Sequence, residues 1–584
     1  MKKSLILSLL ALAAIAFTGC KGHDGEPQLK GRNLVVYGKI FTADNNAIAD
    51  AFAVENGKFV YVGDAAGAKK YKRRGFTVID HTDKGIVIPG CYESHAHYLM
   101  GSALTLMGGA PSIINEYDTL IEMIKTAYTK AKAEGKSSIC GFGWGYQIFA
   151  LSGAIPTRQE LDSLCPDVAL FVCDSEIHKG IANTLCLQNA GILDKDGKVL
   201  ISKIRGGEIC MDTANKPTGL LKEQAATYVR VRGLNFEEIF PTSVAMAAIE
   251  HSQKQLLANG YISYMDGWTN VFGTNALYDA AKALDKDDRL HMLLGLGYDI
   301  ESSCENVNDE IGKAIQKKQY TGGHVNADFV KLFIDGTVET GTGFTTEEYQ
   351  ADRFGYGVAI WEEDEVTDIT RAANANGMTM HIHTMGDAAV HRAVNAFVNG
   401  GKKELRNTVV HTRNVMTDDY RRMADNNIVA VSGMYWHNLT PLQKWILDAV
   451  VPVNLIGKAY PIKSYFDAHV VATAHSDYPA SAKSPIGPFE IMQIAITGKK
   501  VADGEDAEPF EPAELISREQ ALQSLTINGA YQMHVENERG SIQVGKYADF
   551  VLVNQDILTC PATDIYQSKV VATYFEGKQV YPNN

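Results

Sequence analysis

The sequence has no pair of cysteines spaced as C-x-x-C, and the cysteines that follow position 20 show no even spacing. They are Cys91, Cys140, Cys165, Cys173, Cys186, Cys210, Cys304 and Cys560. This distribution argues against a disulfide framework as the basis of the fold. We expect most of these side chains to be buried as small apolar groups. An oxidising compartment would permit a bridge among the five from Cys140 to Cys210.

The chain also lacks a basic stripe, an internal repeat and a low-complexity tract. Its formal net charge of −14 argues against nucleic acid as a partner, because nucleic acids are bound by clustered Lys and Arg. A small-molecule partner is the better expectation. With 45% hydrophobic and 21% charged residues, the composition is that of a globular enzyme. At 584 residues, one large domain and a smaller part are expected.

The N-terminal apolar run, Leu5–Phe17, is too short to span a bilayer, which takes roughly 20 apolar residues. It follows two lysines and ends shortly before Cys20, as in a targeting signal. The small residue before Cys20 resembles the lipobox of bacterial lipoproteins. We therefore expect residues 1–20 to be a signal peptide ending at acylated Cys20, and the protein to be an extracytoplasmic lipoprotein, anchored at the periplasmic face or cell surface. Phe17 departs from the more usual Leu, so a plain secretory signal stays open.

Short β-rich segments separated by turn residues occupy both ends of the chain. After a polar linker at 21–30, they begin with Leu34–Phe41 and Ala51–Val62, and they return near the C-terminus with Val570–Phe575. Because both ends share this pattern of short strands and turns, we expect one small β-sandwich domain built from residues 31–86 and 538–584.

Between these ends, short apolar runs alternate with helical stretches, which is the rhythm of a parallel α/β fold. The expected strands are Ile86–Ile88, Ile262–Met265, Met292–Leu296, Phe329–Ile334, Met378–His383, Thr408–His411, Ile428–Ser432 and Val470–Ala474. Eight such strands predict a (β/α)₈ TIM-like barrel over residues 87–537. The stretch from about 115 to 250 is too long for one connection, so we expect an inserted lobe over the barrel mouth.

His95 and His97 form an H-x-H pair that follows an apolar segment. Side chains at i and i+2 leaving a strand project from one face, so both imidazoles can reach one metal ion. Such a pair alone is a weak signal, because most are surface or core histidines.

Further polar residues stand at the C-terminal ends of later strands, where barrel enzymes carry their catalytic groups. They are Lys331, His383, His411 and Asp477. Each has a structural alternative: the lysine could pair with a buried acid, a histidine could hold a loop, and Asp477 could cap a helix. One shared site explains all of them together better than separate coincidences.

Four motifs resemble the amidohydrolase superfamily, specifically the family 3 amidohydrolases that include N-substituted formamide deformylases. They are Gly141-Phe142-Gly143-Trp144, Pro156-Thr157-Arg158, Pro217-Thr218-Gly219 and Gly545-Lys546-Tyr547-Ala548-Asp549. The resemblance runs from about Asn33 to Tyr581.

The resemblance implies a two-metal site. In it, His95 and His97 bind one ion, His383 and His411 bind the other, and a carboxylated Lys331 bridges both. Asp477 would touch the first metal and the bridging water, and would move its proton. Zinc suits these ligands best, while manganese, iron and nickel stay open. The implied reaction is hydrolysis of a non-peptide C–N bond in a small amide, N-acyl or N-formyl amine, or cyclic amide, by a metal-bridging hydroxide.

Four positions depart from the family pattern: Glu93, Ala388, Val410 and His475. None removes a metal ligand, although they can alter the groups that orient the ligands. The ligand count is ambiguous by one, since His475, His381 and His97 all qualify.

A second group could contact substrate: Trp144, His178, Glu223, Asp266 and His437. Each could equally pack its own lobe or hold a loop.

Cleavage of an ester or lactone, or deamination, stays open because substrate choice lies in loops. A non-catalytic lipid-anchored binding protein is the alternative of another class. Related barrels also make a homodimer an expectation by analogy.

Overall fold

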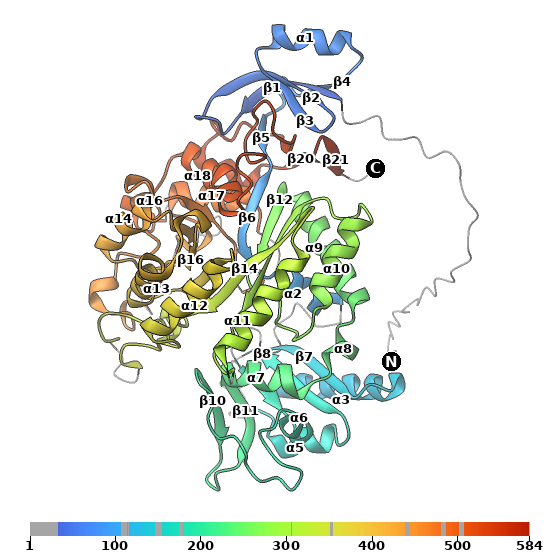
Figure 1. Ribbon diagram of the computed structural model, residues 1–584, viewed down its shortest axis with the longest axis vertical. Coiled ribbons are helices and arrows are strands. Elements are labelled where there is room, and N and C mark those ends of the chain that lie inside the picture. Colours follow the sequence, from blue (N-terminus) through green and yellow to red (C-terminus); the bar gives the residue numbers. More distant parts are fainter. Residues whose placement is uncertain are drawn as a thin grey trace, which may run out of the picture.

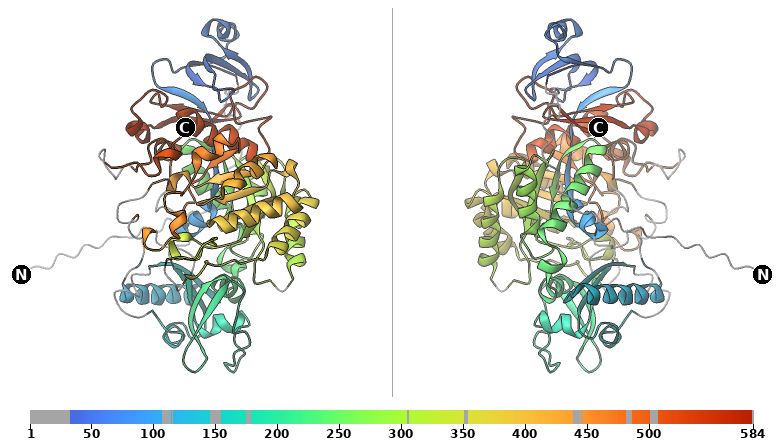
Figure 2. Two further views of the ribbon diagram at one scale, coloured as in Figure 1. Left: turned by 90° about the vertical axis from the view of Figure 1, so that its left-hand side faces the viewer. Right: turned by 90° about the vertical axis from the view of Figure 1, so that its right-hand side faces the viewer.

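The computed structural model describes residues 33–106, 114, 116–145, 155–174, 179–304, 306–350, 354–438, 444, 447–480, 486–500 and 507–582. The expected leader with Cys20, and His178, lie outside these ranges. Within them, none of the helices combines the length and apolar character that crossing a bilayer requires. The eight cysteines from Cys91 to Cys560 are all free thiols. Figures 1 and 2 show three parts stacked along the long axis: a terminal β sheet, a central barrel and a lobe.

The terminal sheet combines strands from both ends of the chain, as expected. Its strands are β1 (Leu34–Phe41), β2 (Ile48–Glu55), β3 (Lys58–Gly63), β4 (Thr77–Asp80), β5 (Ile86–Pro89), β19 (Phe550–Val553), β20 (Val570–Phe575) and β21 (Lys578–Tyr581), with helix α1 (Ala65–Arg73) beside them. The order is β21-β20-β19-β5-β1-β2-β3, with β4 paired to β1. The eight strands form one continuous sheet rather than two separate ones.

This sheet curls so strongly that its two ends pack on each other like the halves of a sandwich. Phe52 on β2 and Phe550 on β19 are three strands apart in the order, yet their ring centroids lie 4.9 Å apart. In a flat sheet, each step between strands alone takes about 4.8 Å. The apolar core of the terminal part therefore lies between strands from opposite ends of the chain.

The central part is a parallel barrel of eight strands in the order β18-β17-β16-β15-β14-β13-β12-β6. The strands are β6 (Cys91–Ala96), β12 (Tyr261–Asp266), β13 (Leu293–Asp299), β14 (Val325–Phe333), β15 (Thr379–Thr384), β16 (Thr408–His411), β17 (Val429–Ser432) and β18 (Ala472–Ala474). Most of their residues are buried, as expected for parallel strands covered on both faces. The (β/α)₈ prediction is confirmed.

One predicted barrel strand belongs elsewhere. Ile86–Ile88 is a strand, but as β5 it pairs with β1 and β19 in the terminal sheet. The barrel begins with Cys91–Ala96 instead, a strand that carries His95 of the H-x-H pair and ends one residue before His97. Because both segments are buried and apolar, hydrophobicity alone does not say which sheet each one joins.

The barrel strands alternate with helices that cover the outside. These helices are α2 (Tyr98–Leu106), α9 (Thr242–Ala258), α10 (Ala276–Lys286), α11 (Val307–Gln316), α12 (Glu363–Ala375), α13 (Asp387–Gly400), α14 (Thr417–Asp425), α16 (Ile462–Asp467), α17 (Pro488–Thr497), α18 (Arg518–Leu525) and α19 (Ile527–Gln532). The first and last strands meet without a ladder. Near their C-terminal ends, Asp477 N donates to His95 O at 3.2 Å and His97 N donates to Tyr478 O at 2.7 Å. The candidate ligands themselves therefore close the barrel.

The lobe lies in the long connection between β6 and β12. Its sheet has the order β10-β11-β9-β8-β7, from β7 (Ser138–Trp144), β8 (Ala169–Asp174), β9 (Lys179–Ala182), β10 (Gly207–Met211) and β11 (Pro217–Glu223). Its helices are α3 (Tyr117–Glu134), α5 (Arg158–Leu164), α6 (Thr184–Asn189), α7 (Gln224–Gly233) and α8 (Phe236–Ile239). Two motifs that are distant in sequence meet here, because Arg158 Nε donates to Pro217 O at 2.9 Å.

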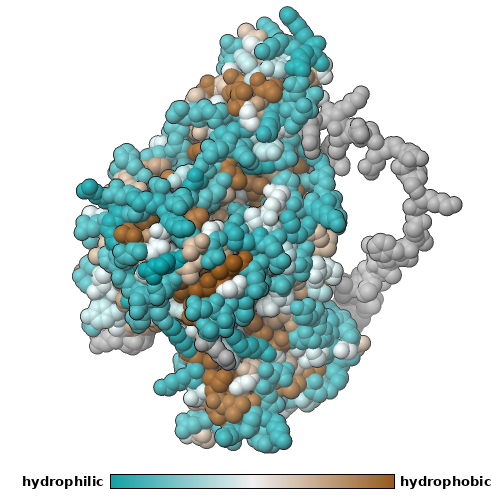
Figure 3. Space-filling model, in the orientation of Figure 1, coloured by the Kyte–Doolittle hydropathy of each residue, from teal (hydrophilic) through white to brown (hydrophobic). Residues whose placement is uncertain are grey.

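The molecular surface is largely hydrophilic on the face that Figure 3 shows, with separate apolar patches over the terminal sheet, the barrel and the lobe. Scattered exposed apolar residues are normal on the surface of a folded protein. The expected homodimer stays a prediction.

The closing motif of the chain ties the terminal sheet together through a buried ion pair. Arg539 Nη1 donates to Asp549 Oδ2 at 2.6 Å, and their side chains are only 5% and 1% exposed. The same guanidinium also donates to Glu576. The aspartate of the Gly545–Asp549 motif is therefore the counter-charge of a buried arginine.

Arg539→Met should lower the free energy of unfolding by about 3 kcal/mol, because Asp549 would stay buried without its cation. The measurement is urea denaturation of the variant beside the wild type. The control is Arg289→Met, which removes an exposed pair with Glu250 and should cost less than about 1 kcal/mol. Equal losses from both substitutions would contradict this account of the motif.

Candidate metal centre

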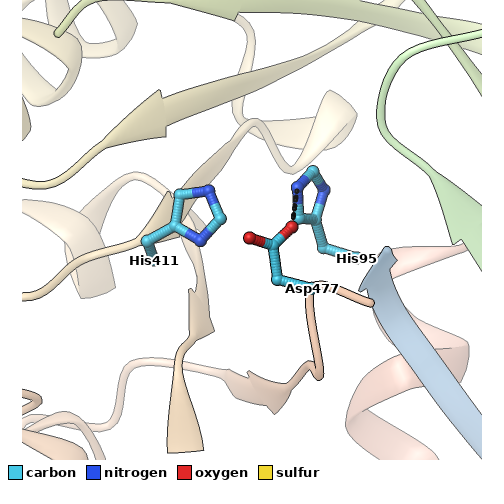
Figure 4. Close-up of side chains that lie close together, drawn as sticks. All are labelled: His95, His411 and Asp477. Carbon is cyan, nitrogen blue, oxygen red and sulfur yellow. Dashed lines mark ion pairs between the residues drawn. The ribbon is translucent and has the colours of Figure 1, made fainter. Parts of the chain in front are cut away.

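The barrel brings the predicted ligands to one buried point at the carboxyl ends of its strands. One ligand atom from each of His95, His411 and Asp477 lies within 4.8 Å of the others. His95 Nε2 and His97 Nε2 are each 3.4 Å from Asp477 Oδ1. Figure 4 shows the Asp477 carboxylate between the rings of His95 and His411, with a dashed line marking its contact with His95.

The backbone at this point adopts a conformation that side-chain-bearing residues rarely take. The φ angles are 72° at His411, 47° at Thr412 and 54° at Asp477. Left-handed backbone of this kind costs about 1–3 kcal/mol per residue and persists only where the surrounding fold imposes it. Two candidate ligands are therefore held in strained positions, which is common at functional sites.

A chain of hydrogen bonds determines which nitrogen of His95 carries the proton. The Thr408 hydroxyl donates to Met380 O at 3.2 Å, so it accepts from His381 Nδ1 at 2.7 Å. His381 Nε2 then carries a lone pair and accepts from His95 Nδ1 at 2.8 Å. The lone pair of His95 therefore resides on Nε2, which faces Asp477.

Two hydrogen-bond acceptors consequently face each other in a buried place. The separation of 3.4 Å between His95 Nε2 and Asp477 Oδ1 is longer than the 2.7–2.9 Å typical of a charge-assisted hydrogen bond. His95 Nε2 has no hydrogen-bond partner within the described part of the chain. A cation bound between the two acceptors would remove their repulsion, so this donor set fits a metal ion.

Five histidines of the centre are neutral, as metal ligands must be. Burial lowers the pKa of His97 and of His475 to about 3. Burial also lowers the pKa values of His95, His381 and His411 well below their usual range. At neutral pH each ring therefore keeps one nitrogen lone pair.

Lys331 lies in β14 among these rings and is fully buried. Among the described residues its Nζ has no hydrogen-bond partner, although it lies 4.5 Å from the centre of the Phe333 ring. Burial lowers the pKa of Lys331 to about 8, against the opposing attraction of Asp477 and Asp299. A substantial fraction of its amine is therefore neutral near physiological pH and able to act as a nucleophile.

His383 approaches from the neighbouring strand, β15. Its Nε2 lies 3.1 Å from Gly336 O, which can only accept, so Nε2 carries the proton and Nδ1 the lone pair. The loop after His383 is held by Asp335, whose Oδ2 accepts from Gly386 N at 2.8 Å and Phe344 N at 2.9 Å. The ring centroids of His383 and His411 are 4.6 Å apart.

The contacts of His381 and His475 bear on how many histidines could bind metal. Both ring nitrogens of His381 are used, one by Thr408 and the other by His95, so His381 orients a ligand rather than serving as one. His475 Nε2 lies 3.3 Å from His411 Nδ1. His475 therefore contacts a ring nitrogen of His411, as His381 contacts one of His95.

Glu93, one of the four departures from the family pattern, contacts two backbone segments of the barrel. Its Oε1 accepts from His95 N at 3.4 Å and from Ser476 N at 3.0 Å. The side chain therefore bridges the seam between the first and last barrel strands. Burial raises the pKa of Glu93 to about 8.

The second group of predicted residues is dispersed. Trp144 packs in the lobe core and donates to Val172 O at 3.1 Å, and Glu223 precedes helix α7 in the lobe. His437 is buried 5.4 Å from the Phe510 ring. Asp266 does come near, with Oδ1 4.0 Å from His97 Nδ1, and it accepts from Trp268 N at 3.1 Å. Substrate contact by these residues stays a prediction.

Aromatic residues that we did not predict surround the centre. The ring centroid of Trp268 is 6.5 Å from that of His97 and 5.6 Å from that of Phe333, and Trp436 lies 5.3 Å from His411. Phe333 stands two residues after Lys331 on the same strand face, and that spacing could have identified it.

Comparisons with known proteins agree with this geometry. A sequence model of the amidohydrolase family matches residues 78–581. The chain is 26% identical over 564 residues to Protein LONG AFTER FAR-RED 3 of Arabidopsis thaliana, covering 94% of this chain and 91% of that protein. It is 25% identical over 560 residues to N-substituted formamide deformylase of Arthrobacter pascens, covering 93% and 97%.

Among solved structures, the fold matches an uncharacterized metal-dependent hydrolase from Pyrococcus horikoshii with a TM-score of 0.68 and 20% identity, over 91% of this chain and 99% of that one. The counterpart from Pyrococcus furiosus gives a TM-score of 0.66 at 21% identity, over 90% and 100%. These likenesses show a shared fold.

Thr408→Val should weaken zinc binding at least about tenfold, since groups that orient metal-binding histidines have effects of this size. Without the hydroxyl, His381 loses the partner that directs its lone pair toward His95. The measurement is zinc titration in competition with a coloured chelator. Thr370→Val is the matched control, because the Thr370 hydroxyl is buried and has no hydrogen-bond partner in the described chain. If the two variants bind zinc alike, the deduced orientation of His95 is wrong.

Proposed function

Because the chain belongs to the amidohydrolase family, as its motifs predicted, we propose that it hydrolyses a C–N bond of a small amide, N-acyl amine or N-formyl amine with the help of two divalent metal ions. One observation carries the proposal. Buried acceptors of His95 and Asp477 face each other at 3.4 Å, beside a lysine amine without a hydrogen-bond partner in the described chain.

The ligands divide into two groups. His95, His97 and Asp477 would hold one ion, and His383 with His411 would hold the other. When bound, two divalent ions lower the pKa of a water molecule toward neutrality and polarise a carbonyl group. Imidazole and carboxylate ligands favour zinc.

Lys331 would join the two groups after reaction with carbon dioxide. The neutral amine forms an N–C bond to the carbon of CO₂ and releases one proton, which leaves an anionic carbamate with two oxygen ligands. A lysine cation would instead repel metal ions. The low pKa that burial imposes on Lys331 supports this role, because only the uncharged amine reacts.

In this proposal Asp477 moves the proton. Its carboxylate takes a proton from the attacking water and gives it to the nitrogen of the leaving amine as the C–N bond breaks. Trp268 and Phe333 supply apolar surface beside the site, which limits competing water. The similarity to an N-substituted formamide deformylase over nearly the whole chain supports a C–N bond as the target.

The test is metal content by elemental mass spectrometry after reconstitution with zinc and ¹³C-bicarbonate, together with a ¹³C NMR search for a carbamate signal. We expect about two metal ions per chain and one carbamate. Lys331→Ala should lose both the bound metal ions and the carbamate signal. Asp477→Asn should lose the hydrolysis of N-formyl and N-acyl amines.

The matched controls are Lys132→Ala and Asp167→Asn, which remove the two partners of an exposed ion pair of 2.5 Å and should change neither readout. A wild-type protein that binds no metal after this reconstitution would exclude the hydrolase. In that case the alternative of a non-catalytic binding protein would take its place.

The N-terminal sequence supports a second proposal, that the mature protein is lipid-anchored through Cys20 outside the cytoplasm. Expressed in a bacterium, the wild type should incorporate labelled palmitate and sediment with membranes, and Cys20→Ser should do neither. A soluble, unlabelled wild type would instead identify a plain secretory signal.

A further inference from the structure

Arg230 of helix α7 is a buried cation with almost no polar contacts. It is 1% exposed, and its Nε and Nη2 have no hydrogen-bond partner within the described residues. Its Nη1 lies 4.0 Å from Cys173 Sγ, and a thiol is only a weak acceptor. The guanidinium therefore retains most of its donor capacity.

Other buried arginines of this protein are paired with acids. Arg413 Nε donates to Glu339 at 2.8 Å, and Arg539 is paired with Asp549. Even Arg232, two residues further along α7 and half-buried, has Glu301 at 2.8 Å. Removing a charge from water is costly unless a partner compensates. Arg230 departs from this pattern, so its partner is to be sought outside the described chain.

The position of Arg230 connects it to the metal centre. Its guanidinium carbon lies 5.5 Å from the Trp268 ring centre, and the same ring is 6.5 Å from the His97 ring. Trp268 also lies against Phe333, 5.6 Å away, whose ring is beneath Lys331. Helix α7 belongs to the lobe and lies on its barrel side (Figure 1). An aromatic strip thus joins the guanidinium to the candidate metal ligands.

We propose that Arg230 binds a carboxylate of the substrate, so that the hydrolysed molecule is an acidic amide with an apolar segment between its carboxylate and its scissile bond. The planar fork of an arginine matches a carboxylate with two parallel hydrogen bonds. The apolar segment packs on Trp268 and Phe333, and the amide carbonyl reaches the histidines. This inference rests on the proposed function for the reacting end of the substrate.

The first test measures binding without turnover, by titration calorimetry. The probes are phenylacetate and 3-phenylpropionate, each compared with its neutral carboxamide. The wild type should bind at least one acid at least about tenfold more tightly than its amide, as expected for a charge-assisted pair in a buried site. Arg230→Gln should abolish that preference, and Arg232→Gln should retain it.

Two outcomes overturn the proposal. One is a wild type that binds neither acid, or binds acids and amides equally, which requires no variant and so does not depend on variant folding. The other is an acid preference that survives in Arg230→Gln, because the acids would then bind the metal ions themselves. Arg230→Gln should melt at or above the wild-type temperature, since it removes an uncompensated charge.

The second test uses hydrolysis. N-formylphenylalanine should be cleaved with a kcat/KM at least about tenfold above that of N-formylphenylalanine amide, and Arg230→Gln should equalise the two through KM. Absence of all hydrolysis would overturn the proposed function while leaving the Arg230-dependent binding intact. Hydrolysis of both substrates with no dependence on Arg230 would overturn this inference alone.

Discussion

The structure depends on one electrostatic constraint: two buried hydrogen-bond acceptors, His95 Nε2 and Asp477 Oδ1, face each other at 3.4 Å. Both atoms are acceptors, and the hydrogen bonds of His381 and Thr408 prevent His95 from placing its proton between them. Such an arrangement is unfavourable in a protein that holds no cation there. The strained backbone at His411 and Asp477 shows that the fold maintains the arrangement at a cost, as it would for a site whose purpose is to bind metal.

The rest of the fold holds His95 and Asp477 in this arrangement. The barrel closes through backbone hydrogen bonds between the segments that carry His95, His97 and Asp477, and Glu93 bridges the same seam. The chain passes directly from β5 of the terminal sheet into β6 of the barrel. The terminal sheet therefore anchors the strand that presents the H-x-H pair. The lobe approaches the centre through Arg230, which lies 5.5 Å from the ring of Trp268.

Much of the centre could be predicted because it obeys local rules. Residues at i and i+2 of one strand share a face, and polar residues that end parallel strands gather at one end of a barrel. These rules bring together His95, His97, Lys331, His383 and Asp477. Local rules could not place Ile86–Ile88, since a buried strand is apolar in either sheet. They also gave no reason to single out Arg230 or Trp268, which meet across the boundary between lobe and barrel. The role of His381 likewise depends on Thr408 of the neighbouring strand.

The most direct test of this account is anomalous X-ray diffraction at the zinc edge from crystals of the reconstituted protein. The account predicts two peaks, one of them between His95 Nε2 and Asp477 Oδ1 and the other beside His383 and His411. A folded protein with no peak in the gap between His95 and Asp477 would contradict it, because the two facing acceptors would then need another explanation.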